Sequence, residues 1–343
     1  MEKVKRLDYV DVCRFLGISL IIFSHITVPN KVLQWLCAFN VPCFFVLSGF
    51  CYRLHNFDKE FVLKKIKTIY VPFVLFAMIY CQGGLSSWVY IFYGSGMALE
   101  LGGTSIVLWF LPCFFTAVII FSLMMNVCNR LKHKVWILIA GVAVMLVGAK
   151  ACEMLKGAQP MLEKYGYPLN FDMAMIGVVL MIAGYYIRPI FDWLGEQKQW
   201  MLMSIAIIFF VITGYTVYLN LPESLNPSCA HVEMAMGSIG NYTLFFCNAL
   251  LMSMALIGLA MLIDKWLKNK VLLLYIGRNT LSLLCVHVVL LLGVSKMFLL
   301  MGLEHESAEM MILQGIVTYV IVIIVSIPVI MVIRRFIPNM VGQ

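Results

Sequence analysis

The chain has 343 residues, of which 62% are hydrophobic and 12% charged, and its mean hydropathy is +0.95. A soluble domain is about half apolar and about a quarter charged. This composition therefore excludes an ordinary water-soluble fold and indicates a protein whose solvent is the lipid bilayer. The net charge of +8 does not point to nucleic acid, because the basic residues lie between apolar stretches, where topology signals and contacts with anionic lipids occur.

Ten apolar stretches are long enough to cross a bilayer, which takes about 20 residues each. They predict an all-α integral membrane protein with about ten transmembrane helices, formed as a single domain over residues 1–343 with no soluble domain. In chain order the stretches are 9–28, 35–53, 68–85, 105–127, 134–151, 170–187, 200–220, 240–264, 279–300 and 310–333.

The basic residues predict the topology. With the N-terminus in the cytoplasm, nineteen Lys and Arg residues fall in cytoplasmic segments, five fall outside, and Arg14 lies within the first stretch. This asymmetry follows the positive-inside rule. It predicts an even number of helices with both termini in the cytoplasm. The 11 cysteines are scattered without metal-ligand spacing, so we interpret them as apolar packing residues and expect no metal site.

The first stretch contains three ionisable residues, which are costly inside a membrane helix and therefore indicate function. Asp11 and Arg14 are three residues apart and can form an intrahelical ion pair. His25 follows Arg14 by eleven residues, close to three helical turns, so both side chains share one face and lie about 16 Å apart along the axis. We expect that face to line a cavity inside the helix bundle.

Two interpretations of this face remain open. A neutral histidine can take a proton from a hydroxyl group near neutral pH, and a planar guanidinium suits a phosphate-bearing ligand. Together they suggest a phosphate-rich cofactor that enters from the cytoplasm, with chemistry deeper in the membrane. Alternatively, Arg14 is a topology anchor and His25 is a hydrogen-bonded packing residue.

Three further candidates lie in the middle of the chain. Ser48 precedes Gly49 in the second stretch, where two small residues permit close helix packing and the hydroxyl can bind a ligand. Trp109 begins the segment Trp-Phe-Leu-Pro, and Asp172 lies at the start of the sixth stretch. Packing, anchoring at the membrane interface and complementation of a helix N-terminus are the simpler interpretations of Ser48, Trp109 and Asp172, respectively.

The last candidates lie near residue 280. Gly277 and Arg278 precede the ninth stretch, and the free amides at a helix N-terminus beside an arginine can bind phosphate. His287 follows eight or nine residues into that helix, where we expect it to be buried. No P-loop, HExxH or GxSxG motif is present. Nucleotide hydrolysis, zinc proteolysis and hydrolase-type serine chemistry therefore have no support from the sequence.

These segments, in this order, resemble acyltransferase family 3 of bacterial membrane proteins. The resemblance rests on RLDYVDVCRFLGISLIIFSH at residues 6–25, with an Arg-x10-His spacing, on FFVLSGF at 44–50, WFLP at 109–112 and YIGRNTLSLLCVH at 275–287. The segment that begins at Phe171 is similar to the stand-alone branch that acetylates fucose or enterobacterial common antigen sugars. Before Arg14 the chain keeps only the Asp of the family's Leu-Asp-Gly-Leu-Arg pattern, and we expect no C-terminal hydrolase-like domain.

The resemblance implies a multi-pass enzyme of the bacterial cytoplasmic membrane. Such an enzyme moves an acyl group, usually acetyl from cytoplasmic acetyl-CoA, to a hydroxyl of a cell-surface or lipid-linked glycan. The family's essential arginine and histidine correspond to Arg14 and His25, and its late histidine corresponds to His287. No metal is implied.

On this basis we assign roles to the candidate residues. His25 acts as a general base or carries the acyl group, and Asp11 holds Arg14 in place. The acyl donor is expected to contact Arg14, Arg278, Lys65 of the basic segment 64–67, and Ser48; the acceptor is expected to contact Trp109, Asp172 and His287.

Two other classes of function fit part of the pattern. A buried Asp, Arg and His also suit a proton-coupled secondary transporter, although the chain shows no paired inverted repeats and no matched broken helices. A non-catalytic acyl-CoA sensor or membrane scaffold would bind the cofactor without turnover. Consumption of acetyl-CoA separates an enzyme from both.

Overall fold

The computed structural model describes residues 7–26, 28–131, 133–155, 160–196, 199–222, 230–302 and 308–336. Within these ranges the chain is helical, with no β-strand and one isolated bridge between Glu233 and Ser238. The helices gather into two compact units. The first comprises residues 1–47, 187–232 and 240–331, and the second comprises 48–186, 233–239 and 332–343.

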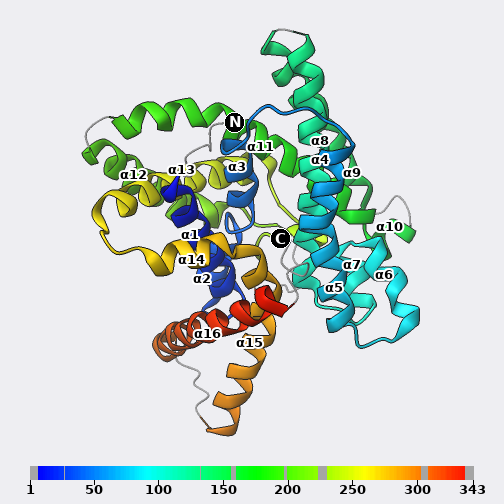
Figure 1. Ribbon diagram of the computed structural model, residues 1–343, viewed down its shortest axis with the longest axis vertical. Coiled ribbons are helices and arrows are strands. Elements are labelled where there is room, and N and C mark those ends of the chain that lie inside the picture. The colour runs from blue at the N-terminus through cyan, green and yellow to red at the C-terminus, as the bar shows by residue number, and fades with distance from the viewer. Residues whose placement is uncertain are drawn as a thin grey trace. The chain divides into compact units, whose positions relative to one another are not determined.

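The first unit is built around helix α1, which packs against α13, α14 and α15 (Figure 1). The face of α1 that carries Asp11 also carries Ile18 and Ile22, and all three side chains are at most 1% exposed. This face therefore packs inside the unit. The helices of the unit are α1 Asp8–Ser24, α2 Asn30–Cys37, α12 Gln199–Thr216, η5 Val217–Leu219, α13 Tyr242–Trp266, α14 Val271–Arg278 and α15 Thr280–Leu300.

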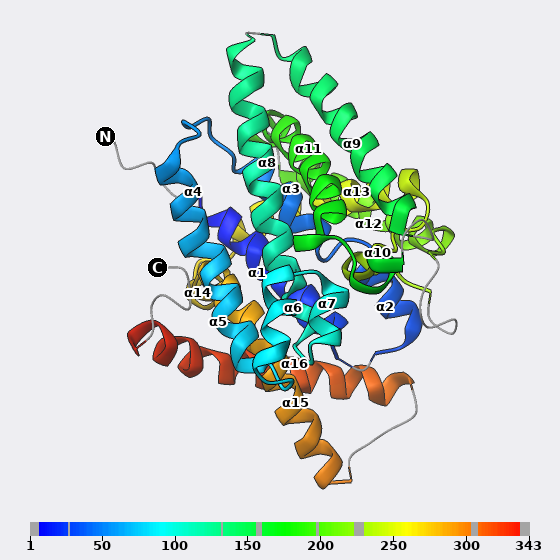
Figure 2. The same ribbon diagram turned by 90° about the vertical axis from the view of Figure 1, so that its right-hand side faces the viewer.

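The second unit contains one continuous helical rod of α4, η1 and α5 (Figure 2). Its middle part, η1, is a π-turn at Ile66–Tyr70. Pro72 explains this turn, because proline has no N–H and its ring clashes with the carbonyl four residues earlier, so the α-helical register is broken before it. Besides η1, the elements of this unit are α4 Lys59–Lys65, α5 Val71–Tyr80, η2 Leu85–Ser87, α6 Trp88–Tyr93, α7 Gly96–Leu101, η3 Ile106–Trp109, α8 Phe110–Arg130, α9 Val135–Leu155, α10 Pro160–Tyr165, η4 Pro168–Asn170 and η6 Met234–Met236.

Three helices contribute residues to both units: α3 Pro42–Phe50, α11 Phe171–Glu196 and α16 Ala308–Phe336. In α3, a Cβ atom on Gly49 would lie 1.8 Å from the backbone oxygen of Met181 in α11. The two backbones touch at this point, so only glycine fits. This contact confirms the prediction that Ser48-Gly49 permits close helix packing.

In the described part of the chain, eight helical segments are long and apolar enough to cross a membrane: Asn30–Phe50, Ile106–Arg130, Val135–Leu155, Pro168–Glu196, Gln199–Leu219, Tyr242–Trp266, Thr280–Leu300 and Glu309–Arg335. The protein is thus an all-α, multi-pass membrane protein. The two remaining predicted stretches, 9–28 and 68–85, are also helical in large part. They are not among the eight spans because α1 has only 17 residues, and because the rod of α4, η1 and α5 carries Lys64, Lys65 and Lys67 directly before α5. The count of ten spans and the cytoplasmic termini stay predictions.

Candidate functional site

Asp11 is the centre of a charged cluster in the first unit. Its side chain is 0% exposed, and Oδ1 accepts a hydrogen bond from Arg14 Nη1 at 3.1 Å. This is the intrahelical pair expected from the spacing of three residues. On the other side, Oδ2 accepts from Arg278 Nε at 3.0 Å. One buried carboxylate therefore positions two guanidinium groups.

Gly277 explains how α14 comes close enough for Arg278 to reach α1. A Cβ atom at residue 277 would lie 1.9 Å from the backbone oxygen of Asp11, so any side chain there would push the two helices apart. Arg278 ends α14, and Asn279 separates it from α15. The predicted helix after Gly277 is present, and its preceding arginine is held by the carboxylate of Asp11.

The cluster extends outward from Asp11 through residues that the sequence did not single out. Asp8 Oδ1 lies 3.4 Å from Arg278 Nη2, and Asp8 Oδ2 lies 3.7 Å from Lys270 Nζ. The ammonium group of Lys270 also contacts the carboxylate of Asp264. The hydrogen bond to Asp264 raises the pKa of Lys270 above its usual value, and the nearby charge of Asp8 adds to this effect.

The formal charges of these residues cancel: Asp8, Asp11 and Asp264 against Arg14, Lys270 and Arg278. The cluster therefore has little net charge to attract an anion from a distance. The side chains of Arg14 and Arg278 are nevertheless 36% and 43% exposed. The N–H groups that face away from the carboxylates can donate to a phosphate at short range.

The two histidines of the first unit lie together. His25 directly follows the last helical residue of α1, and its side chain is exposed, whereas His287 on α15 is 0% exposed. Their ring centroids are 5.4 Å apart and the rings are tilted by 44°. The prediction that His287 is buried in the helix after Arg278 is confirmed.

The hydrogen bonds of His287 determine its tautomer. Nδ1 lies 2.8 Å from the carbonyl oxygen of Leu284 and 3.1 Å from that of Leu283. Because a carbonyl oxygen only accepts, Nδ1 carries the proton. In the neutral ring Nε2 then keeps its lone pair. Nε2 is buried and has no hydrogen-bond partner among the described residues.

Ser24 and Asn40 hold the end of α1 that carries His25. The amide of Asn40 donates from Nδ2 to Ser24 Oγ at 2.9 Å, and this hydroxyl donates to the carbonyl of Ile21 at 2.8 Å. Asn40 Oδ1 accepts from the backbone N–H of Val41 at 2.7 Å. These bonds restrict the last turn of α1 and hence the backbone of His25.

Four candidates belong to the second unit. Ser48 is half-buried, and Trp109 is buried at 7% exposure. Lys65 lies over the ring of Phe61, 5.4 Å from its centroid. Burial lowers the pKa of Lys65, with a smaller contribution from the charge of Lys64. Asp172 lies in the first turn of α11, as the helix N-terminus interpretation expects.

The surroundings of Asp172 are a further polar region of this unit. Asp172 is 1% exposed, and its Oδ1 has no partner within the described part of the chain. Nearby, Asn170 adopts a left-handed backbone with φ of 48°. Its side chain accepts from the N–H of Gly96 at 2.8 Å and donates to the oxygen of Ala235 at 3.2 Å. Asn170 thus ties three short helical elements, η4, α7 and η6, together beside this carboxylate.

With this geometry established, the chain was compared with known proteins. A family model for an acyltransferase domain, the acyltransferase 3 type, matches residues 7–335. The chain belongs to acyltransferase family 3. Searches of the curated proteins and of the solved structures found no match. The family match covers nearly the whole chain. Both histidines and the Asp11 cluster of this membrane acyltransferase therefore lie within the matched domain.

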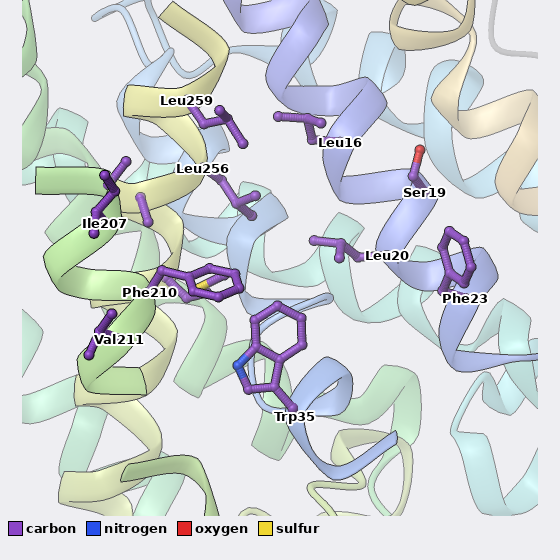
Figure 3. A pocket seen from close by; sticks show the side chains of 13 residues that line it. Leu16, Ser19, Leu20, Phe23, Trp35, Ile207, Phe210, Val211, Leu256 and Leu259 are labelled. Atoms are coloured by element: carbon purple, nitrogen blue, oxygen red, sulfur yellow. The ribbon is translucent and has the colours of Figure 1, made fainter. Parts of the chain in front are cut away.

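An apolar pocket of about 420 Å³ lies in the first unit of this acyltransferase (Figure 3). Leu16, Leu20 and Phe23 on α1 line it together with residues of α2, α12 and α13. The single hydroxyl in its wall, Ser19 Oγ, is already bonded to the oxygen of Phe15 at 2.8 Å and to Tyr319 Oη at 2.7 Å. The lining of the pocket is therefore almost entirely apolar.

The pocket lies on a different side of α1 from the charged cluster. Each helical residue turns the side-chain direction by about 100°, so Leu16 lies about 160° from Arg14, and Phe23 lies about 180° from it. The pocket and Arg14 thus lie on opposite sides of α1. Among the described residues, no group of His, Cys, Asp and Glu side chains could hold a metal ion.

Proposed function

We propose that this acyltransferase is an O-acyltransferase of the bacterial cytoplasmic membrane. It moves an acyl group, most simply acetyl, from cytoplasmic acyl-CoA to a hydroxyl of a cell-surface or lipid-linked glycan. The observation that carries the proposal is the pairing of exposed His25, which directly follows α1, with buried His287 on α15. Helix α1 also carries Asp11, which orients the guanidinium groups of Arg14 on α1 and Arg278 on α14.

Arg14 and Arg278 are proposed to bind the phosphates of coenzyme A. Asp11 fixes both guanidinium groups, which lowers the entropy that each would lose on binding a ligand. Helix geometry separates Arg14 from His25 by about 16 Å, and the pantetheine arm can span such a gap between phosphate and thioester. The contacts of the donor with Lys65 and Ser48 stay predictions from the sequence.

His25 is proposed to act as general base on the acceptor. Its neutral imidazole takes the proton of the glycan hydroxyl, and the oxygen attacks the thioester carbonyl. The tetrahedral intermediate breaks its C–S bond, and the leaving thiolate takes the proton from the imidazolium. The products are the ester and free coenzyme A, and His25 is neutral again. In the alternative route, His25 itself attacks the thioester and passes the acyl group on.

Trp109 and Asp172 are proposed to contact the acceptor. An indole ring can pack on the apolar face of a sugar, and a carboxylate with an unpartnered oxygen can accept from sugar hydroxyls. The side chains of Asp172 and Trp109 are buried, at 1% and 7% exposure, so both contacts stay predictions from the sequence. A lipid-linked glycan would present its sugar at the membrane surface, where a multi-pass enzyme can reach it.

The test uses purified protein in lipid nanodiscs with radiolabelled acetyl-CoA and a cell-envelope glycan extract. Wild type is expected to move label into glycan, and His25→Ala is expected to lose transfer by at least about 100-fold. His133→Ala is the matched control, because His133 is an exposed loop histidine, and it should retain wild-type rates. If folded wild type neither transfers label nor releases coenzyme A, the transporter interpretation is favoured instead.

A further inference from the structure

We propose that His287 is a positioning residue that selects the tautomer of His25. In this arrangement His287 Nε2 accepts a hydrogen bond from one N–H of His25, directly or through a single bound water. The other nitrogen of His25 then presents its lone pair to the acceptor hydroxyl. The inference rests on the proposed function for His25, and it changes the role expected of His287 from substrate binding to orientation of the base.

The first step concerns which nitrogen of His287 is available. Its Nδ1–H is shared between the carbonyls of Leu284 and Leu283, at 2.8 and 3.1 Å. These carbonyls belong to the preceding turn of the same helix, so the bond persists as long as α15 is intact. The ring is thereby held with Nε2 as an acceptor on the opposite side.

The second step concerns what Nε2 can reach. It is shielded from solvent and has no partner among the described residues, and a buried acceptor without a partner is unfavourable. The imidazole of His25 is packed against this ring, with centroids 5.4 Å apart, and it always carries at least one N–H. A rotation of the exposed His25 side chain, or one bridging water, satisfies Nε2.

The third step excludes direct chemistry by His287. Its side chain is 0% exposed, so an acceptor sugar cannot approach Nε2, and Nδ1 is occupied by the helix backbone. His25 is exposed, but neutral imidazole has two tautomers of similar energy, and only one places a lone pair toward a given substrate position. A hydrogen-bond acceptor that is fixed on α15, such as His287 Nε2, selects one of these two tautomers.

The experiment compares two variants of His287. His287→Leu lacks a hydrogen-bond acceptor, whereas the side-chain oxygen of His287→Gln reaches approximately the position of Nε2. His287→Leu is expected to lower kcat about 10- to 100-fold with the KM for acetyl-CoA unchanged, and His287→Gln is expected to restore most of the loss. Equal rates for wild type and His287→Leu, or equal losses in Leu and Gln variants of a folded protein, would overturn the proposal.

A second measurement does not depend on turnover. Nitrogen NMR of ¹⁵N-histidine-labelled protein, at a pH where imidazoles are neutral, separates a protonated ring nitrogen from one with a lone pair. The His25 signals, assigned by their absence in His25→Ala, should show a single tautomer in wild type and a mixture in His287→Leu. A mixture already in wild type contradicts the proposal. If wild type shows one tautomer but no acyl transfer, the proposed function fails while the pairing stands.

Discussion

Asp11 and Arg278 are 267 residues apart in the sequence, and their side chains meet at 3.0 Å between Oδ2 and Nε. The carboxylate has no exposed surface and also binds Arg14. This relationship joins the first helix of the chain to the segment before the His287 helix. It therefore couples the arginines that we propose to bind the donor to the helix that carries the second histidine.

Asp11→Asn is predicted to weaken both the fold and donor binding. The amide keeps the shape but leaves two arginines without their anion, and charge-assisted hydrogen bonds of this kind contribute about 1.5–3 kcal/mol when fully buried. Because both guanidinium groups are partly exposed, we expect a loss of about 2 kcal/mol. Thermal unfolding in detergent and the KM for acetyl-CoA measure the two effects. Asp8→Asn, at a carboxylate that is 38% exposed, should cost much less; an equal loss would argue against the central role of Asp11.

Gly277→Ala is predicted to destabilise the protein by about 1–3 kcal/mol, because the added methyl group meets the backbone of Asp11 and forces α14 away from α1. Gly293→Ala is the matched control on α15, where nothing lies within 4 Å of the new atom. There we expect no loss, and a gain of up to about 1 kcal/mol from helix propensity. Unfolding midpoints of the two variants test this, and similar values would contradict the close contact at Gly277.

Lys270→Met is predicted to lower stability at neutral pH by up to about 1 kcal/mol, since the ammonium group bridges Asp264 and Asp8. The folded-state pKa of Lys270 is raised above the ordinary 10.5. Its contribution is therefore fully present below about pH 10.5 and is lost as the pH rises through the higher folded value. The difference between wild type and variant should shrink at strongly alkaline pH. Lys268→Met is the control, and a pH-independent difference would rule out this pair as its source.

Ile207→Trp is predicted to narrow the apolar pocket while leaving acyl transfer within about twofold of wild type, because the pocket lies on the opposite face of α1 from Arg14. Ile208→Trp, next to it and outside the pocket lining, is the matched control, since both isoleucines are more than half exposed. Transfer rates measured in nanodiscs decide the question. Loss of kcat in the Ile207 variant alone would place the reaction in the pocket.

Local patterns were enough to predict several features of this acyltransferase. The composition was enough to predict that the protein lies in the lipid bilayer and is all-helical. A chain that is 62% hydrophobic must form the hydrogen bonds of its backbone internally when it lies inside lipid. Helical periodicity was enough to place Asp11 beside Arg14, since this relationship lies within one helix. The prediction that His25 shares the face of Arg14 stays a prediction, because His25 lies just beyond the end of α1. The order of four motifs indicated the family that the whole-chain match later confirmed.

The contacts between helices could not be predicted in this way. Asp11 meets Arg278 because Gly277 lets α14 pack onto the backbone of α1, and His25 meets His287 because α1 also packs against α15. The fully buried position of Asp11 and the lone pair left on His287 Nε2 likewise depend on neighbours that are distant in sequence. Periodicity specifies which side of a helix a residue occupies, whereas side-chain packing between helices decides which partner that side meets.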